Sequence, residues 1–302
     1  MEKKLKNDFE KIIKISNFSK ETIKIKENYL KNFIEYGFPN RKFEDWKFSD
    51  INQIIKKNIG ELDFFNDYSN TNNINSSIFV DGLEHNKIIF IDGVIEKIEF
   101  SYEDKDKIQI LDQNQLKSFS KNENSLISLN SAFTNKYYKI AVKENYSLKK
   151  PLIVYQTTTE NLKYKNINLR LDFLLERNSS LKLIEIFEDL SKKNFINIFS
   201  NFELKKDSIL KNYKIDKKVN DNIKYSYNNI NQDENSISET FILSSGSKFI
   251  KNEVNCNLNG KYSSAFINGV FSLKDHSHHE IRTNVNHLTE NTKSYQLIKS
   301  VL

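Results

Sequence analysis

The chain has 302 residues, of which 38% are hydrophobic, and this is enough for one large domain or two of ordinary size. Its 46 basic and 40 acidic residues leave a net charge of +6 and are mixed along the sequence, which does not favour nucleic-acid binding. No run of about 18 apolar residues occurs, and no signal-peptide stretch follows Met1, so we expect a cytoplasmic protein without a membrane partner. The single cysteine, Cys256, excludes an internal disulfide framework.

Residues 1 to about 60 show the spacing of amphipathic helices. Apolar residues on one helical face occur in two clusters, which are Leu5, Phe9, Ile12 and Ile13, then Tyr29, Leu30, Phe33 and Ile34. Gly37 and Pro39 end the second helix, because glycine adopts the cap conformation and proline cannot continue a helix. We therefore predict a small helical region over residues 1–65.

The loop after these helices, residues 37–50, contains the only tryptophan and one of the two prolines of the chain. Its neighbouring acids, Glu44 and Asp45, could be read as acid-base groups, but adjacent residues on an extended loop point apart. We expect them to pair with Arg41 or Lys47, while the tryptophan anchors the loop on the helical domain.

Residues 66–77 are rich in Asn, Ser, Asp and Thr and read as a linker. From residue 78 the hydrophobic period changes to two, which is typical of strands. The clearest stretches are residues 88–91, 152–155, 169–173, 181–186 and 199–204. Little helical pattern follows residue 130, so a parallel sheet with flanking helices is not expected.

A serine recurs near the start of the apolar strands, at Ser147, Ser180, Ser208, Ser247 and Ser277. The successive intervals are 33, 28, 39 and 30 residues, in the range of repeat architectures. A sandwich would show turns about every 8 to 12 residues. We therefore predict a β-solenoid over residues 78–302.

Three segments of the sequence are distinctive. The first is residues 37–50, with the sequence GFPNRKFEDWKFSD. The second lies within residues 269–302 and includes EIRTNVNH and SYQLIKSVL, and the third joins LNSAF at 129–133 to KKPL at 149–152. All three resemble the SufB/SufD family of iron-sulfur cluster assembly proteins, and the N-terminal segment favours its SufD branch.

The resemblance implies a right-handed parallel β-helix preceded by helices, acting as a non-catalytic scaffold. It also implies a SufB-like partner and a SufC-like ATPase. A homodimer is another expected assembly. This chain alone would bind no cofactor, and an iron-sulfur cluster would be held only at an interface with a partner. Family members continue beyond the position of Leu302 with a Cys-Ser-His-Gly segment and a helical region that docks the ATPase. This chain is then either a fragment of a longer protein, which is the simpler interpretation, or a shortened gene product with impaired partner docking.

Four of the five histidines lie close together, at His276, His278, His279 and His287. Strand alternation places His276 and His278 on one face and His279 on the other, so two of them could share a metal with His287. A polar turn between coils is the simpler interpretation. Cys256 alternates with Val254 and Leu258 and is expected inside the solenoid as a small hydrophobic residue.

No phosphate-binding loop, dinucleotide fingerprint, zinc-protease motif or nucleophile elbow occurs in the sequence. We therefore assign no catalytic, cofactor-binding or metal-binding residue. The alternative function is a polysaccharide-binding or polysaccharide-cleaving β-helix protein, because parallel β-helices often act on acidic polysaccharides. That alternative would be favoured by clustered aspartates on one face, which the sequence does not show.

Overall fold

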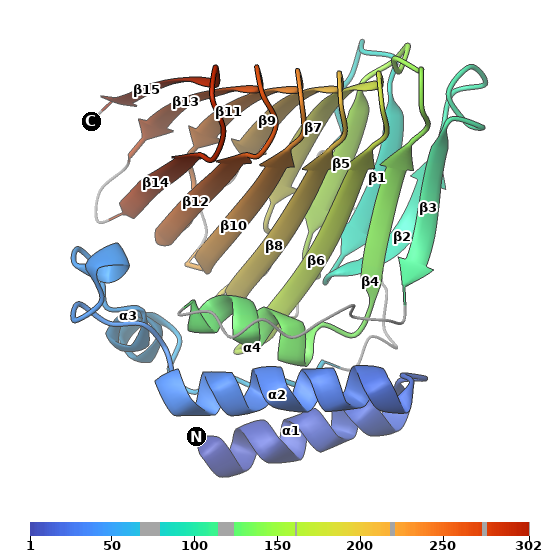
Figure 1. Cartoon of the computed structure of the whole chain (residues 1–302). Coiled ribbons are helices and arrows are strands. Elements are labelled where there is room, and N and C mark those ends of the chain that lie inside the picture. The colour runs from blue at the N-terminus through green and yellow to red at the C-terminus, as the bar shows by residue number, and fades with distance from the viewer. Residues whose placement is uncertain (67–78, 114–123, 161, 218–220, 274–276, 302) are drawn as a thin grey trace.

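A layer of helices lies against one side of a β-solenoid in the computed structural model, which describes residues 1–66, 79–113, 124–160, 162–217, 221–273 and 277–301 (Figure 1). The helices are α1 (Glu2–Ile15), α2 (Lys20–Tyr36), α3 (Ile51–Asn58) and α4 (Ser125–Phe133). The predicted mainly β fold, a solenoid of about five turns after an N-terminal helical region, is confirmed.

The solenoid consists of two sheets. One contains β1 (Asn86–Ile91), β2 (Val94–Glu99), β5 (Leu152–Thr157), β7 (Ser180–Glu188), β9 (Ile209–Asp216), β11 (Ile237–Ser244), β13 (Ser264–Ser272) and β15 (Lys293–Val301). The other contains β3 (Ile108–Gln113), β4 (Tyr137–Val142), β6 (Asn166–Leu175), β8 (Phe195–Leu204), β10 (Ile223–Gln232), β12 (Phe249–Leu258) and β14 (His278–His287). From β4 onward, successive strands alternate between the sheets and pair in parallel with the strand one coil away. Antiparallel pairing, β1 with β2 and β3 with β4, occurs at the N-terminal end.

One corner of the solenoid repeats the same tight turn. A residue with positive φ is followed by a buried serine, as in Asn178–Ser179, Asp207–Ser208 and Asn235–Ser236. Asparagine and aspartate tolerate this left-handed conformation better than most residues. The hydroxyls of Ser179 and Ser236 donate to the carbonyl three residues earlier, at 2.6 and 2.7 Å.

The predicted serine repeat is wrong in its register. Ser180 and Ser208 lie at the corner before β7 and β9, but Ser247 and Ser277 precede β12 and β14 in the other sheet. The predicted series therefore crosses from one corner to the other, which explains its 39-residue interval. The position equivalent to Ser208 in the next coil is Ser236, because Ile209 pairs with Ile237.

Helix α2 begins and ends as its sequence predicts. Ser19 accepts a hydrogen bond from the Thr22 amide at 3.1 Å, and Gly37 follows the helix with φ of 67°. Lys26 on this helix is fully buried, and its ammonium group donates to Ser131 O, Thr134 O and Tyr137 Oη at 2.8–3.0 Å. Burial lowers the pKa of Lys26 well below its usual range.

Helix α4 was not predicted. All of its residues are buried, between α2 and the β6–β8 region of the solenoid. A helix that is covered all round lacks the one-sided apolar spacing by which helices are recognised in a sequence. The described residues form three hydrophobic clusters: one between the sheets, one shared by the helices and the outer face of the seven-stranded sheet, and a small one on the outer face of the eight-stranded sheet.

The predicted linker, residues 66–77, lies outside the described residues apart from Asn66. The boundaries at 1–65, 66–77 and 78–302 therefore stay predictions. Just before the linker, Asp63 forms a parallel bridge with Lys165, and the Asn66 amide donates to Asn166 O at 3.1 Å. The end of the N-terminal region thus contacts the solenoid directly.

No helix among the described residues is both long enough and apolar enough to span a bilayer.

Candidate functional site

The loop of residues 37–50 docks on the outer face of the seven-stranded sheet. Trp46 is 3% exposed, and its ring centroid lies 5.7 Å from that of Tyr225 in β10. The ammonium group of Lys251 in β12 lies 4.3 Å from the centroid of the same indole. The prediction that the tryptophan anchors the loop on the helical domain is therefore incomplete, because its closest polar and aromatic partners belong to the solenoid.

The two acids of this loop have different partners. Glu44 pairs with Lys47 at 2.7 Å, as predicted. Asp45 instead forms an ion pair with Arg282 in β14, and its backbone carbonyl accepts a hydrogen bond from Lys251 Nζ at 2.6 Å. The expected pairing of Asp45 with Arg41 or Lys47 is thus wrong. The expected extended loop is also wrong at these residues, because Glu44–Trp46 form a short 3₁₀ helix, η1. Successive side chains of such a turn point in different directions, so the second acid reaches the solenoid.

Beneath the loop, the side chains of β12 and β14 form a buried charge cluster of Lys251, Glu253, Glu280 and Arg282. The ammonium of Lys251 donates to Glu280 Oε2 at 2.7 Å and lies 3.8 Å from Glu253 Oε1. Arg282 Nη1 lies 3.6 Å from Glu253 Oε2. Among the described residues, Glu253 Oε1 has no hydrogen-bond partner. The cluster therefore joins the loop to two adjacent coils but leaves one carboxylate oxygen unsatisfied.

The two carboxylates of this cluster have opposite pKa shifts. Burial raises the pKa of Glu253 to about 7, against the attraction of Lys251 and Arg282. Burial also acts to raise the pKa of Glu280, but hydrogen bonds from His278 and Lys251 outweigh it and hold that pKa at about 2. Near neutral pH, Glu280 is ionised, and Glu253 is divided between its two forms.

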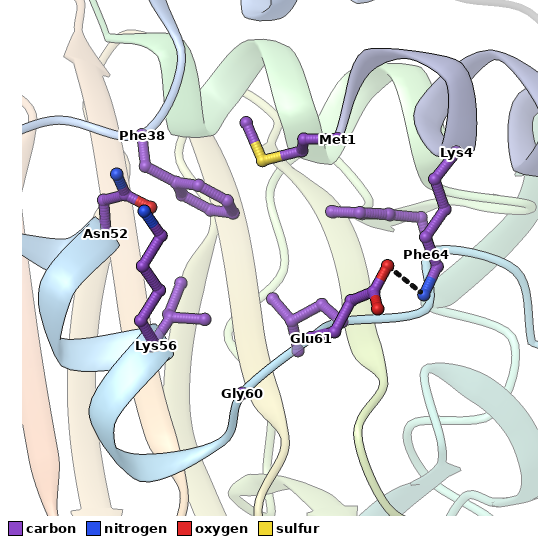
Figure 2. Close-up of a pocket in the computed structure, with 10 residues that line it drawn as sticks. Met1, Lys4, Phe38, Asn52, Lys56, Gly60, Glu61 and Phe64 are labelled. Carbon is purple, nitrogen blue, oxygen red and sulfur yellow. Dashed lines mark ion pairs between the residues drawn. The ribbon is translucent and has the colours of Figure 1, made fainter.

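Two hollows flank the loop. A cleft of about 570 Å³ contains Arg41, Lys57, Lys248 and His278 in its wall. A cavity of about 340 Å³ lies between α1 and α3, and Figure 2 shows the Phe38 and Phe64 rings facing it from opposite sides. The wall of this cavity is mainly apolar. The ammonium of Lys4 beside it is already paired with Glu61 at 3.2 Å.

The histidines do not converge. His278 and His279 face opposite sides of β14, as the alternation predicts: His278 stacks on Phe249 and bonds Glu280 at 2.7 Å, whereas His279 contacts Ser244 Oγ at 3.2 Å. His287 contacts Thr292 and Ser294 near the start of β15. His276 lies outside the described residues. Within the described ranges, no group of three or more His, Cys, Asp or Glu side chains could hold a metal ion.

Cys256 faces the solenoid interior with Val254 and Leu258, as predicted. Its thiol is fully buried, and burial raises its pKa to about 12. A buried, protonated thiol is a poor nucleophile and a poor metal ligand.

Next to the charge cluster, the outer face of the same sheet carries two ladders of amides. Asn229, Asn255 and Asn284 each donate to the residue one coil earlier, at 2.8–2.9 Å, starting from Asn201. The second ladder runs from Glu203 through Asn231 and Asn257 to Asn286, at 2.7–2.9 Å. Sequence reasoning missed both ladders and the charge cluster. The outward positions of β8, β10, β12 and β14 carry the same residue types one coil apart. This repeat in the sequence becomes visible once the strands are aligned in the register of the structure.

A comparison with protein-family models matches residues 155–302 to "SUF system FeS cluster assembly, SufBD core domain". This segment is a SufBD core domain. A search of curated proteins found no match to the chain. The SufBD core begins in β5 and includes the later strands, so it contains Lys251, Glu253 and Arg282. The loop of residues 37–50 and helices α1 to α4 precede it and pack on it.

The family match places the chain in the SUF iron-sulfur cluster assembly system, whose SufBD members are generally non-catalytic scaffold components. It does not distinguish SufD from SufB. The predicted second segment of resemblance, residues 269–302, lies within the matched core, whereas residues 37–50 lie outside it.

Proposed function

We propose that this chain is a SufD-like scaffold subunit of the cytoplasmic SUF machinery. It pairs with a SufB-like subunit and works with a SufC-like ATPase. The observation that supports this most is the SufBD core of residues 155–302 folded as a stack of parallel coils. Such a stack offers a stiff surface to other subunits, and the SufD branch follows from the resemblance of residues 37–50.

The folded core supports pairing through its surface. Residues 155–302, which match the SufBD core, form stacked parallel coils whose outward side chains another subunit can contact. We therefore place the SufB-like subunit on the surface of residues 155–302. An iron-sulfur cluster, which would be the cargo of the machinery, would then be held between subunits.

Hydrogen-deuterium exchange tests this placement. The chain is co-expressed with a SufB-like subunit and a SufC-like ATPase from one SUF operon, and the exchange of the complex is compared with that of the isolated chain. We expect amides within residues 155–302 to exchange more slowly in the complex, because a bound subunit suppresses the local opening that exchange requires. Amides of β2, which lies outside the matched core, are the internal control and should be unchanged.

Failure to form a complex with either subunit would contradict the scaffold function. A complex that protects β2 but leaves residues 155–302 unchanged would contradict the placement. Cleavage of polygalacturonate by the purified chain would instead support the alternative β-helix enzyme.

A further inference from the structure

The outer face of the eight-stranded sheet carries a continuous apolar band. Strand pairing aligns its first row across successive strands as Ile153, Ile184, Tyr213, Phe241, Asn268 and Leu297. The second row is Ile89, Tyr155, Ile186, Ile215, Leu243, Val270 and Lys299. These side chains face away from the interior cluster, which uses the alternate positions of the same strands.

The chain itself covers the first half of this band. Phe79 and Val80 pack on the part formed by β1, β5 and β7. The Phe79 ring lies 5.1 Å from the Tyr155 ring in an edge-on arrangement, and the Val80 amide donates to Tyr155 Oη at 3.1 Å. Lys87 places its ammonium 5.5 Å from the centroid of Phe79. A short extended segment with one aromatic anchor is therefore sufficient to bury this surface.

The second half of the band, from β9 to β15, has no such cover from the described residues. Tyr213 is 39% exposed and Leu297 42%. Helices α1, α2 and α4 lie on the side of the seven-stranded sheet (Figure 1). With strands about 4.8 Å apart, this uncovered part is about 14 Å long. Partly exposed apolar side chains on four neighbouring strands are typical of a protein interaction surface.

The charges beside this area are basic. Lys182, Lys293 and Lys299 are exposed on the same face, and no ion pair joins them to a described residue. Of the acids on this face, Glu239 is paired with Lys211 at 3.0 Å, and Glu188 lies at the end of β7. A second copy would bring like charges together, whereas a partner with carboxylates around apolar side chains would complement them.

We propose that the uncovered band from β9 to β15 binds an acidic, aromatic-anchored segment of a partner protein, in the way that Phe79 and Val80 cover the adjacent half. Tyr213, Phe241 and Leu297 supply the apolar contacts. Lys182, Lys293 and Lys299 pair with the partner's carboxylates. This inference does not depend on the SufB-like subunit, because it concerns the side chains of one sheet face and is tested with a peptide.

Binding of a designed peptide to the full chain tests the inference. The probe is a synthetic peptide that alternates Phe with Glu, with a fluorophore at one end, and the counter-probe alternates Phe with Lys. We expect the acidic peptide to bind and the basic one not to bind. The double variant Lys182→Glu/Lys299→Glu should weaken binding about tenfold or more. Lys97→Glu, on β2 at the other end of the sheet, is the matched control and should leave binding unchanged.

Two further variants test the apolar contacts. Tyr213→Ser and Leu297→Ser change partly exposed side chains, so both proteins should fold, as thermal unfolding will verify. Each should weaken the binding of the acidic peptide several-fold. In the unsubstituted chain, the bound peptide should protect Tyr213 from oxidative footprinting. Equal binding of both peptides, or binding unaffected by either pair of variants, would overturn the proposal. A concentration-dependent dimer that Tyr213→Ser abolishes would replace it with self-association through this face.

Discussion

Lys251 Nζ donates a hydrogen bond of 2.6 Å to the backbone carbonyl of Asp45, across 206 residues of sequence. The same ammonium contacts the Trp46 ring and Glu280, so one side chain fastens the N-terminal loop to two coils of the SufBD core.

Replacing Lys251 with Met should lower the free energy of unfolding by about 2 kcal/mol or more. The change leaves Glu280 without one of its donors and removes the cation from the indole face. Urea unfolding measures the loss, and tryptophan fluorescence reports the loop directly because Trp46 is the only tryptophan. Lys97→Met, at an exposed position of β2, is the control. Equal unfolding free energies for the two variants would contradict the anchoring role.

The raised pKa of Glu253 predicts that stability falls as the pH rises. Its pKa is about 7 in the fold and 4.5 as the usual value, so between these values the folded state binds more protons than the unfolded state. The stabilisation is fully present below about pH 4.5 and is lost as the pH rises through about 7, on the order of 3 kcal/mol in total.

Glu253→Gln should flatten this dependence. Urea unfolding of both proteins at about pH 5 and about pH 8 measures the slope. Burial raises the pKa of Asp189 to about 6. The unfolding free energy of the variant should therefore still fall with pH, but with a smaller slope. Glu280 stays ionised over this range, because its pKa is about 2. An unchanged slope in Glu253→Gln would show that another group carries the effect.

The amide ladders predict that a substitution in the middle of a ladder lowers the unfolding free energy more than one at its end. Asn257 donates to Asn231 and accepts from Asn286, whereas Asn286 closes the ladder at the last described coil. Asn257→Ala should therefore cost about 1–2 kcal/mol of unfolding free energy, and Asn286→Ala about half of that. Chemical denaturation of the two variants provides the comparison. A larger cost at Asn286 would contradict a role for the ladder in stability.

Cys256 should resist alkylation in the folded protein. Its thiol is fully buried and its pKa is about 12, so near pH 8 the reactive thiolate is scarce and shielded. Mass spectrometry after treatment with iodoacetamide should show unmodified native protein and complete modification in concentrated guanidinium chloride. Cys256→Ala should keep the ability of the assembled SUF complex to build clusters. Loss of that ability in a stably folded Cys256→Ala protein would assign the thiol a chemical role.

The architecture could be predicted from the sequence because period-two hydrophobicity is a local property. The inward side of β12, with Val254, Cys256 and Leu258, follows from alternation alone. The coil register did not follow, because serines occur at both corners and only pairing reveals which are equivalent. Helix α4 was missed because burial on all sides removes the contrast on which helix recognition depends.

The charge cluster could not be predicted for a different reason. Lys251 and Glu253 occupy outward positions that a strand pattern assigns to solvent. They are buried because Asp45 and Trp46, more than two hundred residues earlier, lie over them. A single sequence contains no signal for so distant a contact, and for the same reason the partner of Asp45 was predicted wrongly.

The distance in sequence between Asp45 and Lys251 also bears on how the chain matures on the ribosome. The loop is translated early, yet its binding surface needs Tyr225, Lys251 and Arg282, which are translated much later. Until then Trp46 has nothing in the solenoid to cover it. We therefore expect closure of this contact to be a late event of biogenesis, and a nascent chain stalled before β12 to be a substrate for chaperones.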